Sequence, residues 1–291
     1  MRKWLTYSVP PEQAGLTVET ILRQQLQVSG RAIQRLTRRR GILLNGRAPF
    51  LGHTVKAGDE LKVLLETAAP APGLTPIHMA LDILFEDEQC LALNKPAGIA
   101  VHPGGPHQGQ KPTLAHGVAY YLQQKGLAPV AHPVHRLDRD TSGVVLFAKH
   151  SHAHHVLDQL LRSGKISRYY QAIVLGQPPA ETGEISAPIG PHPHHPQLRA
   201  IIPAGQPALT RYRLLQTGKE WSLLELELVT GRTHQIRVHL SHLGCPILGD
   251  KYYGGPAAPL APRPLLHCQR LVWPGQGISA PLPADFRNFL K

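Results

Sequence analysis

The stretch HRLDRDTSGVVLFAK, from His135 to Lys149, decides how the rest of this chain is interpreted. It places one carboxylate, Asp138, between Arg136 and Arg139, directly before an apolar run that predicts a strand. Nearby positive charges favour the ionised form of a carboxyl group, and a turn at a strand end can present a side chain to a cleft. Asp138 therefore either acts on a ligand or only caps the turn and pairs with a neighbouring arginine, and the residues alone leave both open.

The composition indicates a protein that binds an anionic partner. The chain has 291 residues, enough for two domains, and a net charge of +12. Nucleic acid is the commonest anionic partner, although charge alone does not separate RNA from DNA or an anionic membrane surface. Cys90, Cys245 and Cys268 are scattered and odd in number, which argues against a disulfide framework or a four-cysteine zinc site and favours the cytoplasm. No segment approaches the roughly 20 apolar residues of a membrane span, and Pro10 and Pro11 argue against a signal peptide.

A change in composition marks a domain boundary. The segment TAAPAPGLTP, residues 67–76, contains three prolines and a glycine, which is typical of an extended linker. We therefore expect a small basic domain over residues 1–66, a linker over 67–77 and a larger domain over 78–291.

The small domain is expected to hold two helices and a hairpin. Periodicity predicts a helix over 17–27 and a second over 30–40 with Ser29 as its N-cap, followed by a strand that ends in the Asn45-Gly46 turn. At 100° per residue, one arc of the second helix carries four arginines, namely Arg31, Arg35, Arg38 and Arg39. Arg47 extends this basic surface. This basic surface either binds an anion or is simply a solvated arginine-rich face.

The larger domain mixes strands and helices in an irregular order, which favours an α+β fold over a doubly wound sheet. Helical spacing occurs at 113–125 and 153–163. Strand patterns occur within 81–93 on both sides of an acidic turn, and at 143–149, 169–175, 210–215 and 221–228.

Four motifs in order resemble the RluA-type family of RNA pseudouridine synthases. They are HRLDRDTSG with the following VVLFAK, ILFEDEQCLALNKPAGIAVHPGG at 83–105, SRYYQAIVLG at 167–176, and TGRTHQIRVHLSHLGCPILGDKYYG at 230–254. Agreement of four motifs in one order is not expected by chance. The small domain is similar to the alpha-L RNA-binding domain, which precedes the catalytic domain in many members. The resemblance implies a mixed, mainly antiparallel catalytic sheet preceded by a small α+β domain.

The resemblance also implies an activity. Such an enzyme detaches uracil from ribose, turns the base and rejoins it through carbon 5, with no metal, redox group or other cofactor. The residue matching Asp138 is catalytic, and a carboxylate suits that work because it can attack as a nucleophile or shield positive charge on the sugar. Arg237 matches the arginine that pairs with it, although an ordinary charge at a strand edge is the alternative.

Tyr170 matches the tyrosine that lies against the target base, where a ring can stack and a hydroxyl can transfer a proton. Alternation along a strand points Tyr169 the other way. Arg136 matches the residue that takes part in base flipping, and a salt bridge to Asp140 is its alternative. Arg232 is a further candidate RNA contact. Weaker candidates for phosphate contacts or scaffold roles lie in the same motifs, namely Lys95, His234 and Lys251.

The histidines at 150, 152, 154 and 155 and the segment PHPHHP at 191–196 raise the possibility of a metal site. Without a His-Glu-x-x-His pattern we favour surface or RNA-facing histidines and expect no metal. The segment at 191–196 departs from the family, which usually has an arginine where Pro191 stands, and Gln206 stands where a lysine is common. We therefore do not assign the family's substrate contacts to residues of this region.

We expect an enzyme that isomerises uridines in structured RNA, with large-subunit ribosomal RNA favoured and transfer RNA as an alternative. An RNA-binding or ribosome-assembly protein without activity is the hypothesis from another class, and a metal-dependent hydrolase built on the histidines is a third. We expect a monomer that binds RNA and no membrane. Nothing in one sequence specifies the target uridine.

Overall fold

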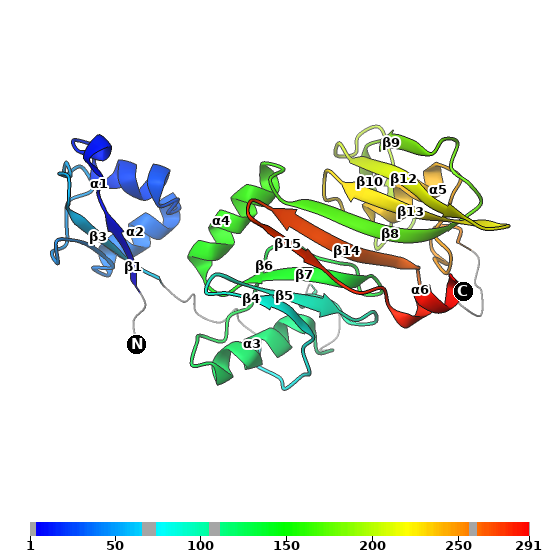
Figure 1. The fold of residues 1–291 in the computed structure, drawn as a ribbon, viewed down its shortest axis with the longest axis horizontal. Coiled ribbons are helices and arrows are strands. Elements are labelled where there is room, and N and C mark those ends of the chain that lie inside the picture. Colours follow the sequence, from blue (N-terminus) through cyan, green and yellow to red (C-terminus); the bar gives the residue numbers. More distant parts are fainter. Residues whose placement is uncertain (1–3, 66–73, 105–110, 256–260, 291) are drawn as a thin grey trace.

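The computed structural model describes residues 4–65, 74–104, 111–255 and 261–290. The two large hydrophobic cores of the described residues are separate, one formed by residues between Val9 and Val63 and one by residues between Cys90 and Phe286. Most of the linker proposed for 67–77 lies outside the described residues, so that boundary stays a prediction. Figure 1 shows the small N-terminal domain at one end of the molecule.

The N-terminal domain combines a short sheet with helical turns. Its elements are β1 (Trp4–Ser8), η1 (Pro11–Gln13), α1 (Val18–Thr20), η2 (Ile21–Gln25), α2 (Gly30–Arg38), β2 (Ile42–Leu44) and β3 (Glu60–Leu64). The antiparallel strands lie in the order β1-β3-β2. β1 was not predicted, because five residues before two prolines give too short a pattern to recognise.

The predicted helix starts and the hairpin turn are confirmed. The side chain of Ser29 accepts a hydrogen bond from the amide of Ala32 at the start of α2. Asn45 and Gly46 have φ values of 51° and 79°, as a two-residue hairpin turn requires. The first predicted helix is one α-helical turn that continues as the π-helical turn η2, and α2 ends at Arg38, two residues earlier than expected, because Arg40 adopts a φ of 53°.

The two faces of α2 separate as the periodicity predicted. Ile33 and Leu36 are buried in the small core. The opposite face borders a hollow of about 450 Å³, lined by Arg31, Gln34, Arg35, Arg38 and Arg39.

The larger domain is built on one long sheet. Its strands are β4 (Ile83–Glu86), β5 (Cys90–Lys95), β6 (His132–Pro133), β7 (Ser142–Ala148), β8 (Ser167–Leu175), β9 (Thr182–Ser186), β10 (Ile189–Pro191), β11 (Arg199–Ile201), β12 (Leu209–Thr217), β13 (Trp221–Leu228), β14 (Leu266–Trp273) and β15 (Gln276–Ser279). Its helices are α3 (Leu114–Gln124), α4 (Ser151–Arg162), α5 (Gln235–His242) and α6 (Ala284–Phe289).

The main sheet has 10 strands along the path β4-β5-β7-β14-β8-β13-β12-β9, with β15 beside β14 and β6 beside β7. The β7–β14 pair is parallel, whereas the other described pairs of this sheet are antiparallel. This confirms the α+β class with a mixed, mainly antiparallel sheet. β10 and β11 form a separate hairpin.

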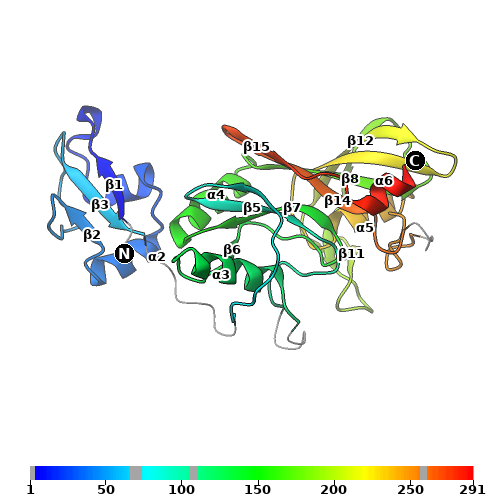
Figure 2. The same ribbon diagram turned by 60° about the horizontal axis from the view of Figure 1, so that its bottom comes forward.

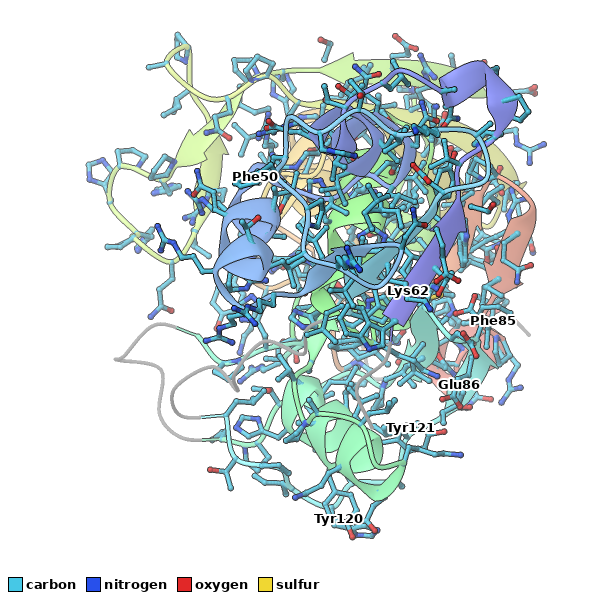
Figure 3. The ribbon with its side chains drawn as sticks, turned by 90° about the vertical axis from the view of Figure 1, so that its left-hand side faces the viewer. Phe50, Lys62, Phe85, Glu86, Tyr120 and Tyr121 are labelled. Atoms are coloured by element: carbon cyan, nitrogen blue, oxygen red, sulfur yellow. The ribbon has the colours of Figure 1, made fainter. Side chains whose placement is uncertain are left out.

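The central strand of the sheet, β7, is covered on both faces. β7 is buried at every position, which its continuous apolar sequence predicts for a strand covered on both faces. Figure 1 and Figure 2 show α3 and α4 beside β5, β6 and β7, whereas α5 lies in the other half of the domain with β11 and β12. The hydroxyl of Tyr121 on α3 donates to Glu86 on β4, and both residues are labelled in Figure 3.

One histidine prediction is wrong. His150 is buried rather than on the surface, and its Nδ1 accepts a hydrogen bond from the amide of Ala153 as the N-cap of α4. Within the described ranges, no three His, Cys, Asp or Glu side chains are grouped as a metal site would require. The helices of the described segments include none that is long and apolar enough to cross a membrane.

Candidate active site

The turn that carries Asp138 lies between β6 and β7 and is held from one side by Lys95. The amide of Thr141 donates to the carbonyl of Asp138 and closes the turn. Lys95 has no exposed surface, and its ammonium group donates to the carbonyl oxygens of Pro96, Ile99 and Arg139 at 2.8, 2.8 and 2.9 Å. Burial lowers the pKa of Lys95 to about 7. Lys95 is therefore a scaffold residue, and its possible role as a phosphate contact is wrong.

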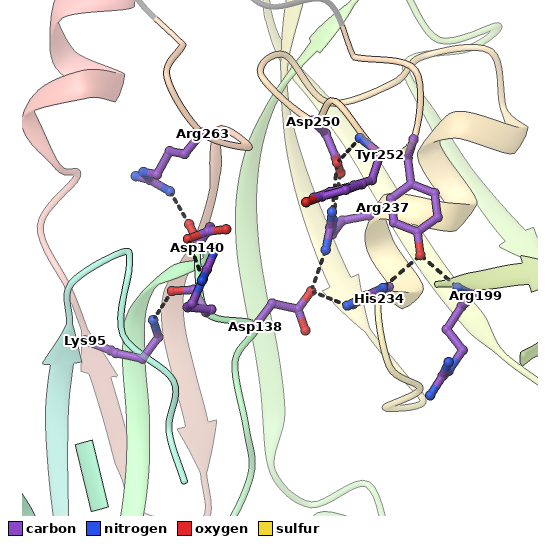
Figure 4. A network of polar contacts seen from close by, with 11 residues as sticks. Lys95, Asp138, Asp140, Arg199, His234, Arg237, Asp250, Tyr252 and Arg263 are labelled. Atoms are coloured by element: carbon purple, nitrogen blue, oxygen red, sulfur yellow. Dashed lines mark hydrogen bonds and ion pairs between the residues drawn. The ribbon is translucent and has the colours of Figure 1, made fainter. Parts of the chain in front are cut away.

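Arg263 holds the same turn from the other side. Its Nη1 donates to the carbonyl of Asp140, its Nη2 to the hydroxyl of Ser142, and its Nε to Asp285 at 2.7 Å. Figure 4 shows the turn between Lys95 and Arg263. Arg263 was not predicted as a site residue, since it lies outside the four motifs.

Gly143 permits the close approach of β7 and β14. Its φ is 111°, and a Cβ there would lie 2.1 Å from the carbonyl oxygen of Cys268. Only glycine fits such a position without moving a strand.

Arg237 meets Asp138 from α5. Its Nη1 lies 3.4 Å from Oδ2 of Asp138, while Nε and Nη2 donate to Oδ2 and Oδ1 of Asp250 at 2.6 and 2.8 Å. Arg237 and Asp250 are buried, so the alternative of a strand-edge charge is wrong. Burial opposes the charged form of Arg237, but the hydrogen bonds that it donates to Asp250 hold its pKa above the ordinary value.

His234 approaches the same carboxylate. Its Nε2 lies 3.9 Å from Oδ2 of Asp138, and its Nδ1 lies 2.8 Å from the hydroxyl of Tyr253. The Tyr253 hydroxyl accepts a hydrogen bond from the amide of Arg199 at 2.9 Å (Figure 4). Burial lowers the pKa of His234, which favours a neutral imidazole. Asp250 and Tyr253 were missed, although they stand in the matched motif GDKYYG.

Tyr170 lies in the wall of the same site. It is buried on β8 and lines a cavity of about 50 Å³ together with Asp138 and Arg237. Burial raises the pKa of Tyr170 well above its ordinary value, so its hydroxyl is neutral. The predicted opposite direction of Tyr169 is confirmed, because its ring packs 4.3 Å from the guanidinium of Arg270 instead.

The arginines proposed as RNA contacts near the site are exposed. Arg136 and Arg232 line the rim of the cavity, and Nε of Arg232 donates to the carbonyl of Pro207. Asp140 pairs with Arg139 at 3.4 Å rather than with Arg136, the partner considered from the sequence. Arg47 and the arginines of α2 belong to the other domain and take no part in this cavity.

The cavity is small in this conformation. Its volume is about 50 Å³, below the roughly 300–1,000 Å³ that is typical of small-ligand sites. The arrangement presents an oriented carboxylate, a neutral tyrosine and a neutral histidine around this space.

Comparisons with known proteins show which families and relatives this chain is similar to. A model described as RNA pseudouridylate synthase matches residues 89–242, and a model described as the RluD ribosomal pseudouridine synthase N-terminal domain matches residues 5–61. The chain is 40% identical over 288 residues to the uncharacterized RNA pseudouridine synthase YhcT of Bacillus subtilis, covering 96% of this chain and 94% of that protein. It is 38% identical over 251 residues to the ribosomal large subunit pseudouridine synthase D of Pseudomonas aeruginosa, covering 80% and 77%.

Solved structures agree with the fold. Human RNA Pseudouridylate Synthase Domain Containing 4 matches with a TM-score of 0.60 and 27% identity, covering 72% of this chain and 91% of that one. Human RNA Pseudouridylate Synthase Domain Containing 1 matches with a TM-score of 0.58 at 24% identity, covering 77% and 89%, and supports the fold alone.

Proposed function

Because the chain belongs to the RNA pseudouridylate synthase family and is an RNA pseudouridine synthase, we propose that it isomerises uridines of large-subunit ribosomal RNA with Asp138 as the catalytic carboxylate. The observation that carries this proposal is the convergence of Arg237, His234 and Tyr170 on Asp138 from α5, the turn before it and β8.

The geometry gives Asp138 an orientation suited to substrate. Arg237 and His234 both face Oδ2 of Asp138, so Oδ1 can face the sugar or the base. Whether the carboxylate faces the sugar or the base, its ionised form can make a covalent bond to that group. It can also shield the positive charge that develops on the sugar as the bond to uracil breaks. Arg237 pairs with Asp138 without turning toward substrate, because Asp250 holds its other two nitrogens.

Tyr170 can serve both binding and proton transfer. Its ring borders the cavity, where it can stack on uracil. Its neutral hydroxyl can relay the proton that carbon 5 releases if it passes its own proton to an acceptor at the same time, and we propose the carboxylate of Asp138 in the same cavity as that acceptor. The target base has to leave its helix to reach this place, at a cost of a few kcal/mol. Arg136, exposed on the rim, is the residue we propose fills the space that the base leaves.

Two features support ribosomal RNA as the substrate class. The N-terminal model that matches is named for a ribosomal pseudouridine synthase, and relatives over 30% identical are named ribosomal large subunit synthases. The arginine-lined hollow on α2 offers phosphate contacts that add affinity without reading sequence. This also makes Arg31, Arg35, Arg38, Arg39 and Arg47 the proposed RNA contacts of the small domain.

Tritium release from RNA labelled at carbon 5 of uracil tests the proposal, because forming the new carbon bond displaces that hydrogen. We expect release from large-subunit ribosomal RNA transcripts with the unmodified protein, none with Asp138→Asn, and similar RNA affinity for both. Asp140→Asn, next to the site but paired with Arg139, is the control and should stay active. Wild-type release by Asp138→Asn contradicts the catalytic assignment, and release from transfer RNA alone contradicts the substrate class.

A further inference from the structure

A second and much larger hollow lies beside the catalytic cavity. Its volume is about 960 Å³, and it is bordered by the loop between β10 and β11, by α5 and by residues 251–254. Residues that shape it include Arg199, Val238, His242, Lys251, Tyr252 and Tyr253. We propose that this hollow binds a second, unpaired nucleotide of the RNA, close to the target uridine. The inference rests on the proposed action on RNA and extends it to a site outside the catalytic residues.

Size favours a nucleotide here. A hollow of about 960 Å³ lies within the range of small-ligand sites, whereas the catalytic cavity in the same conformation measures about 50 Å³. The hollow therefore has room for a nucleotide in this conformation.

The lining suits a base and its phosphate. Tyr252 is 56% exposed, and Nζ of Lys251 lies 5.2 Å from the centre of its ring. Aromatic rings beside a cation are the combination that binds single-stranded nucleic acid, through base stacking and phosphate contact. Val238 and Ile201 belong to a small apolar cluster that provides a floor.

Charge favours an anionic ligand over a metal ion or a basic peptide. The described residues that line the hollow include Arg199 and Lys251 but no Asp or Glu. Two of its histidines, His192 and His195, have ring centres 5.0 Å apart, and the described residues contain no three-residue metal group to which they could belong.

The hollow shares a wall with the catalytic site. Tyr253 borders the hollow, and its hydroxyl lies 2.8 Å from Nδ1 of His234, whose Nε2 lies 3.9 Å from Asp138. The guanidinium of Arg237 lies 4.8 Å from the Tyr253 ring on the same side. A nucleotide in the hollow is thus separated from the carboxylate of Asp138 by one histidine and one tyrosine. This short separation is expected for a nucleotide that lies near the target uridine in the RNA chain.

A series at Tyr252 tests the proposal on the full chain with a large-subunit ribosomal RNA transcript as the probe. Loss of one stacked base corresponds to roughly a 5- to 150-fold change in affinity. We expect Tyr252→Ala to raise KM by about that factor with kcat nearly unchanged, and Tyr252→Phe to behave as the unmodified protein because it keeps the ring. Tyr120→Ala is the control, since Tyr120 lies on α3 in the other half of the domain (Figure 3).

A binding measurement separates this inference from the catalytic proposal. The affinity for the same transcript is measured with Tyr252→Ala and Tyr252→Phe in the Asp138→Asn background, where no turnover is needed. Weaker binding by the alanine variant alone supports the hollow even if Asp138 proves not to be catalytic. The stacking site is overturned if the Asp138→Asn protein and its two Tyr252 variants bind the transcript with equal affinity, or if the alanine and phenylalanine variants lose equal affinity. Thermal melting shows that each variant is folded.

Discussion

Arg237 forms two hydrogen bonds with Asp250, at 2.6 and 2.8 Å, and both side chains are buried. This pair leaves Nη1 of Arg237 facing Asp138 at 3.4 Å. Two parallel hydrogen bonds fix the plane of a guanidinium more firmly than one bond does. Asp250 therefore aims the arginine, and the arginine orients the carboxylate that we propose is catalytic.

Asp250→Asn should destabilise the protein and lower its activity. A buried guanidinium that loses its charged partner costs about 3–5 kcal/mol, and Arg237 would then be free to turn toward Asp138. Urea unfolding measures the first effect and tritium release the second. Glu225→Gln, which breaks the exposed pair with Arg213, should change neither noticeably. An Asp250→Asn protein as stable and active as the unmodified one would refute the positioning role.

Tyr170→Phe should separate stacking from proton transfer. The ring is retained, so KM should change little, whereas loss of the hydroxyl should lower kcat by about 10²–10⁴ if it transfers the proton. Tyr170→Leu should raise KM as well, because it loses the ring. Steady-state tritium release gives both constants. Unchanged kcat in the phenylalanine variant would assign the proton transfer elsewhere.

Arg31→Ala and Arg38→Ala should weaken RNA binding without affecting turnover at saturation. Each lost phosphate contact lowers the slope of log affinity against log salt by about 1. Binding of a ribosomal RNA transcript at several salt concentrations measures this slope. Gln34→Ala, which lines the same hollow without a charge, is the matched control. If the slope stays constant in both arginine variants, α2 is only a solvated face.

Gly143→Ala should destabilise the protein by several kcal/mol, roughly 2–4, since a Cβ would meet the backbone of Cys268 and the φ of 111° is strained for alanine. Gly98→Ala is the comparison. Gly98 has a φ of 88° but open space around a Cβ, so only the conformational strain remains. Thermal unfolding of the two variants should therefore differ clearly, and equal losses would show that the β7–β14 contact is not tight.

Stability should fall in acid because buried histidines are neutral in the folded protein. Burial lowers the pKa of His135 to about 3 and that of His267 to about 4, below the value near 6.5 of an unfolded chain. Below pH 6.5 the unfolded state therefore binds more protons than the folded state. The free energy of unfolding is highest above that pH and falls toward pH 4, by about 1 kcal/mol per pH unit for each histidine. Urea unfolding at several pH values measures the slope. His267→Asn should reduce it, whereas His194→Asn, an exposed position, should not.

Local chemistry made much of the fold predictable. The continuous apolar run of β7, the strand pattern of β13 and the cap at Ser29 depend on neighbours within a few residues, so they can be recognised in the sequence. β1 was missed because a five-residue edge strand has little pattern of its own. His150 was misjudged because burial depends on which element packs over it.

The candidate site was predicted only where the motifs name it. Asp138, Tyr170 and Arg237 come together as the resemblance implied, although the catalytic roles of all three stay proposals. The partners Asp250, Tyr253 and Arg263 could not be predicted. Their contacts join residues that are separated in the chain, by 13 positions for Arg237 and Asp250 and by 123 for Asp140 and Arg263, and no local pattern encodes which side chains meet after such a separation.

The sequence by itself determined the class of chemistry, the order of motifs and the basic character of the chain, because these follow from residue types and their spacing. Only the tertiary structure decided that Asp250 holds Arg237, that Lys95 is buried as a scaffold, and that a hollow of about 960 Å³ lies beside a catalytic cavity of about 50 Å³. Each of these depends on the distance between side chains from separate elements, and packing of the whole sheet with α5 sets that distance.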